Sequence, residues 1–393
     1  MNTSRRFFII LLLVAFVTVE GCKKTSTPTQ SVAPQTPTTA TAPEQYHQSE
    51  GGSVPPAEVK YFKGSIGSSL GLQMKLVRNG DQLSGNYFYQ KVGTKIDLRG
   101  SVDKEGNLLL DEFDAGGKQT GSFKGIWRPD PDDGLISIAG NWSKPSSGKG
   151  SDKKTAFSVH EEPIAFGGGV ELVAKQIKEN NKKLNYEVAA EYPQLTGSTN
   201  PNAEKFNQAV RSSVTKKIGV FKTEMATPET EELPGESMGS DISMGYTVAL
   251  AQDDLVSIRF EVGGYHRGAA HPNSYSEVFN FDLRNGRPLK LGDLFKPGAK
   301  YLQAISSYCI SDLKKQSKAR PEDGLLDGSG FEGGAAPNAK NYQSWTIAKR
   351  GLGITFDAYQ VGPYAAGPQS VLVPYTAIKD LVKPDGPIAQ FVK

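Results

Sequence analysis

The chain has few cysteines and few histidines, and it lacks an excess of charge of either sign. Its 393 residues include two cysteines and four histidines, with 45 Lys and Arg against 42 Asp and Glu. No concentrated basic block is present, which argues against a nucleic-acid partner because such binding needs a concentrated positive face. The chain also lacks a phosphate-binding loop and a Cys-His pairing. These two signatures of catalysis are therefore missing.

Long hydrophobic runs are also missing, apart from one short run near the N-terminus. Phe7 to Val19 is apolar except for Thr18 and follows two arginines, but it is shorter than the roughly 20 apolar residues that a spanning helix needs. The residues before Cys22 read Val-Glu-Gly, which places a small residue next to the cysteine. This pattern is typical of a cleaved signal, so we expect a lipoprotein signal peptide over residues 1–21 and a lipid on Cys22. An uncleaved signal anchor is the alternative, because Glu20 is unusual at such a site.

A lipid on Cys22 would make the membrane a partner and place the protein in the bacterial cell envelope, facing the periplasm or the cell exterior. Cys309 would then have no intramolecular partner, so we expect a fold without a disulfide. Residues 22–57 are rich in Thr, Pro, Ser, Gln and Ala and carry almost no apolar side chains. Such a segment cannot bury enough surface to offset the entropy of ordering, and we expect a disordered tether.

Residues 58–160 form short segments with an apolar side chain at every second position, which is the pattern of β-strands. Turn signals such as Asn79-Gly80 separate the segments. Glycines inside them, as at Gly85 and Gly100, are typical of places where a sheet bends sharply. We predict an all-β domain, a small antiparallel barrel or strongly curled sheet, similar to lipocalins and avidins in architecture only.

Residues 161–169, which end in three glycines, are expected to link this domain to an α+β domain over residues 170–393. Asn200-Pro201 reads as a helix start, with a capping residue before proline at the first helical position. A second helix is expected around Cys309, which lies on an apolar stripe and is therefore predicted to be an inert core residue. Strands are predicted between these helices and again at residues 345–356 and 369–373.

Several stretches of this second half carry a family resemblance. Residues 186–195 read YEVAAEYPQL, residues 264–271 read GYHRGAAH and residues 356–367 read FDAYQVGPYAAG. In this order they are similar to the extracytoplasmic domain pair shared by RsiV-type anti-sigma factors and PdaC-type peptidoglycan deacetylases. The resemblance covers residues of roughly 184–383, and its one visible departure is Gly-Ala-Ala-His where the family has Gly-Gly-Ala-His.

The resemblance implies a fold more firmly than an activity. PdaC-type enzymes carry a deacetylase module after this domain pair, whereas this chain ends shortly after its last predicted helix and has no Thr-Phe-Asp-Asp-Gly metal motif. RsiV-type proteins use the pair outside the cell to sense lysozyme, and they also carry a cytoplasmic segment. If this chain is cleaved before Cys22, we expect nothing of it to remain on the cytoplasmic side. We therefore expect a non-enzymatic lipoprotein, without a cofactor, that binds peptidoglycan or a wall-directed protein such as a lysozyme or another muramidase.

Two histidines are the best candidates for chemistry. His266 and His271 lie five positions apart in a glycine-rich loop that begins beside Tyr265. Two histidines and a carboxylate can bind zinc and leave a position open for hydrolysis, so a glycan hydrolase or deacetylase using His266 and His271 is the first alternative. Their spacing matches no standard zinc site. A structural bend with imidazoles that donate to backbone carbonyls is the preferred interpretation, and we predict no metal.

The predicted binding surface combines that loop with a second one. Tyr359 and Tyr364 lie among glycines and prolines in residues 359–367, and aromatic residues on rigid loops are good binding anchors. We predict that Tyr265, His266, His271, Tyr359 and Tyr364 contribute to one surface, although a packed turn is the alternative for the second loop.

A small apolar ligand in the β domain is a further alternative function. In that case the aromatic side chains of the strands would line a cavity, whereas in a barrel this small they more commonly fill the core. The residues in question are Tyr87, Tyr89, Trp127 and Trp142.

Overall fold

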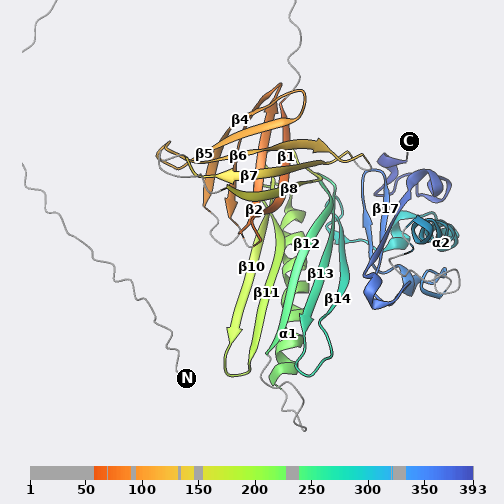
Figure 1. The fold of residues 1–393 in the computed structure, drawn as a ribbon. Coiled ribbons are helices and arrows are strands. Elements are labelled where there is room, and N and C mark those ends of the chain that lie inside the picture. The colour runs from red at the N-terminus through yellow and green to blue at the C-terminus, as the bar shows by residue number, and fades with distance from the viewer. Residues whose placement is uncertain are drawn as a thin grey trace, which may run out of the picture. The chain divides into compact units, whose positions relative to one another are not determined.

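The structure is a computed structural model that describes residues 57–392, except 69, 90–93, 132–133, 146–153, 227–238, 320 and 322–332. The predicted signal peptide, Cys22 and the predicted tether up to residue 56 lie outside the described residues. The described chain folds around three hydrophobic cores, one in a barrel, one between a sheet and a long helix, and one in a C-terminal unit (Figure 1). Among these residues, every helix is too short or too polar to cross a membrane.

The N-terminal part is a closed antiparallel barrel, as predicted. Each strand pairs with the next one along the chain, and β1 closes the barrel by pairing with β8. The strands are β1 (Glu58–Ile66), β2 (Leu70–Asn79), β3 (Gln82–Tyr89), β4 (Lys95–Val102), β5 (Asn107–Phe113), β6 (Gln119–Pro129), β7 (Ile136–Ser143) and β8 (Lys154–Glu162).

Side chains fill the interior of this barrel. The rings of Tyr87, Phe123 and Phe157 pack edge to face, with centroids 5.4 and 5.0 Å apart. The Tyr87 hydroxyl donates to the buried Glu112 carboxylate at 2.5 Å, and Trp142 Nε1 donates to it at 3.0 Å. Buried polar groups need such partners. The aromatic side chains therefore act as core filling, which weakens the alternative of an apolar ligand in the barrel.

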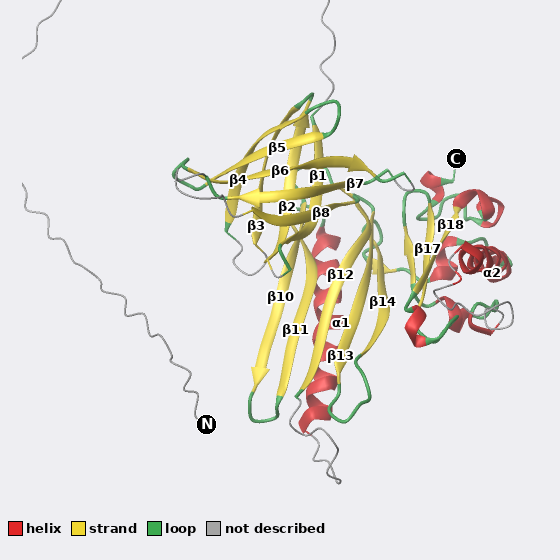
Figure 2. Ribbon diagram, in the orientation of Figure 1, coloured by secondary structure: helices red, strands yellow, loops and turns green. Residues whose placement is uncertain are grey.

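The second part is a mixed sheet whose long strands carry α1 on one face (Figure 2). Residues 161–169, the expected linker, contain the end of β8 and the short strand β9, which pairs with β12. The strands are β9 (Ile164–Ala165), β10 (Glu171–Asn181), β11 (Tyr186–Thr196), β12 (Ser240–Gln252), β13 (Leu255–Tyr265), β14 (Asn273–Asp282) and β15 (Arg287–Pro288).

Helix α1 (Pro201–Ala226) begins where the sequence predicts it. The Asn200 side chain accepts a hydrogen bond from the Asn202 amide at 2.9 Å, which satisfies an otherwise unpaired helix N–H. The helix crosses from β11 to its parallel neighbour β12, and its apolar face packs on the sheet. The buried residues of that face are Ala203, Phe206, Val210, Val214, Ile218 and Phe221.

The C-terminal unit packs a three-stranded sheet and α2 (Tyr301–Ala319) around one core. Its strands are β16 (Trp345–Ile347), β17 (Gly351–Phe356) and β18 (Gln369–Pro374). Residues 345–356, predicted as one strand, are therefore a hairpin, and this detail of the prediction is wrong. Cys309 is fully buried in this core, where burial raises the pKa of its thiol to about 12. Such a thiol is protonated and unreactive at neutral pH.

A buried polar cluster joins the second sheet to this unit. Ser257 on β13 donates to the side-chain oxygen of Asn280 on β14 at 2.5 Å. The Asn280 amide in turn donates to the Trp345 carbonyl at 2.8 Å, and Ser257 Oγ accepts from the Ile347 amide at 2.8 Å. Each partner is satisfied inside the protein, so the cluster fixes β16 against β13 and β14.

Candidate functional site

The two loops predicted to form a binding surface lie against each other. The ring of His271, in the loop between β13 and β14, lies 4.3 Å from the ring of Tyr364, centroid to centroid. The ring of Tyr359 lies 5.4 Å from Tyr364 on the same basis. These three side chains, which we call the aromatic stack, come from segments about 90 positions apart in the sequence.

Hydrogen bonds hold the stack in place. The Tyr364 hydroxyl donates to the carbonyl oxygen of Pro272 at 2.8 Å, and His271 Nδ1 lies 2.8 Å from the same oxygen. Because a carbonyl oxygen only accepts, His271 carries its proton on Nδ1. This is the contact that the structural-bend interpretation expects of the imidazole.

Tyr359, the outer residue of the stack, has an exposed ring and a strained backbone. Tyr359 is 63 % exposed, and its φ of 71° lies in the left-handed region that side chains other than glycine rarely adopt. Both oxygens of the neighbouring Asp357 carboxylate accept from the Ser276 amide at 3.0 Å, which ties this loop to the edge of β14. Strained positions concentrate at functional sites, where the surrounding structure maintains them.

His266 and Tyr265 have different surroundings from the stack. The His266 ring meets Phe221 of α1 edge to face, with centroids 5.7 Å apart. Tyr265 is the half-buried last residue of β13 and pairs with Asp241 of β12. His266 and His271 thus contact different elements. Within the described ranges, no three His, Cys, Asp or Glu side chains gather as metal ligands would.

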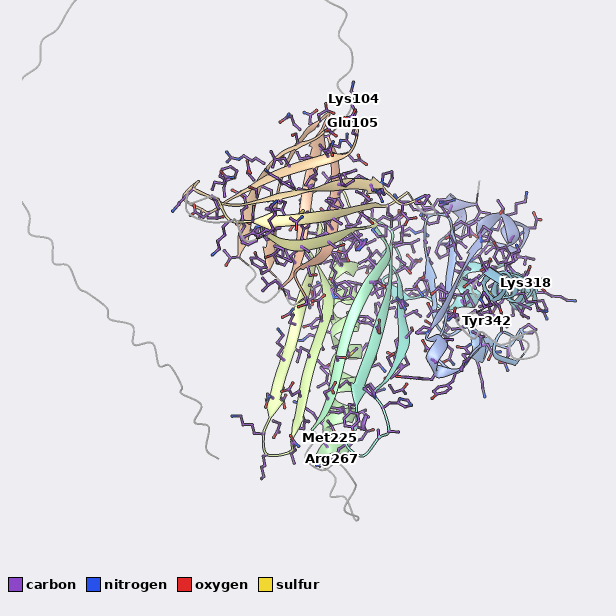
Figure 3. The ribbon with its side chains drawn as sticks, viewed as in Figure 1. Lys104, Glu105, Met225, Arg267, Lys318 and Tyr342 are labelled. Carbon is purple, nitrogen blue, oxygen red and sulfur yellow. The ribbon has the colours of Figure 1, made fainter. Side chains whose placement is uncertain are left out.

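The first of two cavities near the stack lies between the second half of α1 and the facing sheet. It measures about 570 Å³, and His266, Phe221 and Lys217 are among its lining residues. Lys217 forms an ion pair with Glu277 of β14, and this partner keeps the pKa of Lys217 raised although burial opposes it. Figure 3 marks the end of the sheet where this cavity lies, by Met225 at the end of α1 and Arg267 in the β13–β14 loop.

A second cavity of about 470 Å³ lies between β14 and the C-terminal unit. Asp357 and Gln360, from the loop that carries Tyr359, line one side of it. Tyr275 and Glu277 line both this cavity and the first one. The aromatic stack and the two cavities therefore surround the first half of β14.

Tyr275 and Asp357 were not predicted as site residues from the sequence. Residues 273–277 read Asn-Ser-Tyr-Ser-Glu, and this segment is too polar for a strand to be predicted there. The alternation of Asn273, Tyr275 and Glu277 was the available signal, because it places these three side chains on one face of an extended segment.

The fold and site thus define a two-part protein, an eight-stranded barrel followed by an α+β region with a polar surface around β14. Residues 292–376 match a family model described as a protein of unknown function, DUF3298. The chain is also 26 % identical over 216 residues to peptidoglycan-N-acetylmuramic acid deacetylase PdaC of Bacillus subtilis. The predicted resemblance to PdaC-type proteins is confirmed to this extent.

The matches are partial in length. The PdaC match covers 55 % of this chain and 42 % of PdaC. Immunogenic protein MPT64 of Mycobacterium tuberculosis is 27 % identical over 119 residues, which are 29 % of this chain and 47 % of that protein. The chain therefore spans less than half the length of these relatives.

Two of the similar solved structures each cover part of the chain. A DUF3298 family member from Bacteroides fragilis has a TM-score of 0.40 and 19 % identity, and it covers 57 % of this chain and 98 % of its own. Afifavidin without ligand has a TM-score of 0.22 and 20 % identity, over 28 % of this chain and 85 % of its own.

Proposed function

We propose that this protein is a non-enzymatic cell-envelope protein that binds a cell-wall polymer, or a wall-directed protein such as a muramidase, through the surface around β14. The aromatic stack carries the proposal. It presents an exposed tyrosine on a rigid support, and buried or supported aromatic anchors dominate the energy of most interfaces. An anchor that is already ordered costs little conformational entropy on binding.

The similarity to PdaC supports the cell wall as the setting. The name of PdaC places its activity on peptidoglycan, and the matched part of PdaC is a minor part of that protein. The likeness of residues 184–383 to RsiV-type lysozyme sensors supports the protein partner.

Replacing Tyr364 or Tyr359 with alanine should weaken binding to peptidoglycan sacculi or to lysozyme by on the order of 1–2 kcal/mol or more. The physical reason is the loss of the exposed ring or of its support. Affinity is measured by pull-down on sacculi and by titration with lysozyme, using the chain that begins after Cys22. Leu109→Ala is the matched control, because Leu109 is a 40 % exposed apolar residue on β5 of the barrel.

Unchanged binding by both tyrosine variants would place the recognition surface elsewhere. The alternative of a deacetylase or glycan hydrolase predicts release of acetate or reducing ends from peptidoglycan, with loss of that release in His271→Ala. Turnover with this dependence would replace the binding proposal by the enzymatic one.

Lipidation of Cys22 belongs to the same proposal, since a tethered wall-binding domain must stay at the membrane. Cys22→Ser should move the protein from the membrane fraction to the soluble fraction, as followed by fractionation and mass spectrometry. A variant that stays with the membrane at its full mass would instead identify residues 1–21 as an uncleaved anchor.

A further inference from the structure

We infer that the two cavities beside β14 form one groove for an extended saccharide, with the Tyr275 ring at its centre. This inference rests on the proposed function and names the chemical class of its wall polymer, a glycan strand. It makes Tyr275 and Ser344, which the sequence did not single out, residues of the binding site.

Continuity of the groove comes from the shared lining of the two cavities. Tyr275 and Glu277 face both the cavity of about 570 Å³ and that of about 470 Å³, so a ligand that crosses Tyr275 occupies both. Each volume alone lies within the roughly 300–1,000 Å³ of small-ligand sites. Together they suit a ligand longer than one such molecule.

The edge of β14 is accessible to such a ligand. On that side, β15 pairs with Phe281 and Asp282 only, so the first half of β14 borders the groove. Asp357 accepts from the outward amide of Ser276 and fixes the far wall against this edge. The groove is therefore preformed, which lowers the entropic cost of binding.

The second cavity is lined by groups suited to hydroxyls. Amides, carboxylates, hydroxyls and a lysine surround it, and Val278 is its single aliphatic lining residue among those described. Ser344 adds a specific signal, since its hydroxyl oxygen is buried and has no hydrogen-bond partner among the described residues. A buried hydroxyl without a partner is costly. A sugar hydroxyl in the cavity would satisfy it.

Tyr275 supplies the flat surface that a sugar ring needs. It is 42 % exposed, and Lys217 Nζ lies 5.4 Å from its ring centroid. An aromatic ring with polar neighbours offers an apolar face and hydrogen-bonding groups together. A pyranose matches this pattern, because its C–H groups pack on the ring while its hydroxyls reach Lys217 and Glu277.

An extended peptide is the competing occupant, because β15 pairs with only two residues on this edge of β14. Peptides added to a sheet edge gain specificity from pockets for alternate side chains. The second cavity has one aliphatic wall residue and many polar ones, so it accommodates a polyhydroxylated ligand better than a row of apolar side chains.

Titration with β-1,4-linked N-acetylglucosamine oligomers of two to six units, and with peptide-free peptidoglycan glycan strands, tests the inference. Affinity should rise at least tenfold from the dimer to the longer oligomers or strands. Tyr275→Ala should abolish that gain, whereas Tyr275→Phe and the barrel control Leu109→Ala should keep it. Ser344→Ala should weaken binding several-fold without lowering the melting temperature, because no protein hydrogen bond is lost.

Two results would overturn the groove while leaving the proposed function intact. One is binding of sacculi by the native chain with no response to ligand length or to Tyr275→Ala. The other is binding of lysozyme that Tyr275→Ala weakens, with no binding of either saccharide probe, which would assign the groove to a protein. Failure of the native chain to bind sacculi or lysozyme would overturn the proposed function itself.

Discussion

Replacing Glu162 with glutamine should stabilise the protein by about 3 kcal/mol at pH 8 and leave its stability unchanged at pH 4. Glu162, at the end of β8, is 8 % exposed. Burial raises the pKa of its carboxyl group from 4.5 to about 7; nearby Lys63 lowers it and Glu191 adds to the increase. The folded chain therefore keeps this proton between pH 4.5 and about 7, where the unfolded chain has released it.

The direction in which stability changes with pH follows from proton linkage. In that window the folded state binds more protons than the unfolded state, so native stability falls as the pH rises and the full penalty is present above about pH 7. Glutamine does not titrate and removes the penalty. Urea unfolding followed by tryptophan fluorescence measures the difference, because Trp127 and Trp142 lie in the barrel.

A matched control is available in the turn between β4 and β5. Glu105 is exposed there (Figure 3), and Glu105→Gln should leave the pH dependence unchanged. If the difference in free energy of unfolding between Glu162→Gln and the native chain is the same at pH 4 and pH 8, the pKa of the Glu162 carboxyl group is not raised by folding.

Gly100→Ala should destabilise the barrel by about 3 kcal/mol, at the upper end of the usual cost of overpacking. A Cβ atom at Gly100 would lie 1.9 Å from the carbonyl oxygen of Leu109 and 2.9 Å from the Cα atom of Leu110 on β5. Both are backbone atoms, so the strands themselves would have to separate. A closed barrel resists this, because each strand is hydrogen-bonded on both sides.

Gly219→Ala is the control with the opposite expected sign. A Cβ atom at Gly219, on the exposed side of α1, meets no atom within 4 Å. Alanine is favoured over glycine in a helix by up to about 1 kcal/mol, so this variant should be more stable than the native chain. If Gly100→Ala leaves the barrel transition at its native urea midpoint, β4 and β5 are farther apart than the structure has them.

Most of the fold was predictable because its strands and helices have strong local signals. The barrel follows from alternating side chains and in-strand glycines, and α1 from its Asn200-Pro201 start. The hairpin of β16 and β17 was missed, since Ala-Lys-Arg before Gly351 carries a weak turn signal. Its turn is closed by the Ala348 amide, which donates to the Gly351 carbonyl at 3.0 Å.

The site was less predictable, because it is formed by contacts between segments that lie far apart in the sequence. His271, Tyr359 and Tyr364 were predicted as site residues from the sequence. The direct contact between the rings of His271 and Tyr364 was not predicted. The strand over residues 273–277 has no apolar run, and its pairing with β13, including Val262 with Tyr275, keeps it extended. Local sequence cannot encode such pairing, and the groove was missed with it.

The arrangement of the three cores also sets an order of folding. Barrel strands pair with their immediate neighbours in sequence, apart from the closure of β1 with β8. The C-terminal core, in contrast, contains Leu250 and Leu255 from β12 and β13. That last core cannot be completed until the sheet before it exists. As domains generally fold from the N-terminus during synthesis, the surface around β14 is assembled last. A chain cut short before residue 345 would have its barrel but would lack Asp357 and Gln360, which line one side of the second cavity.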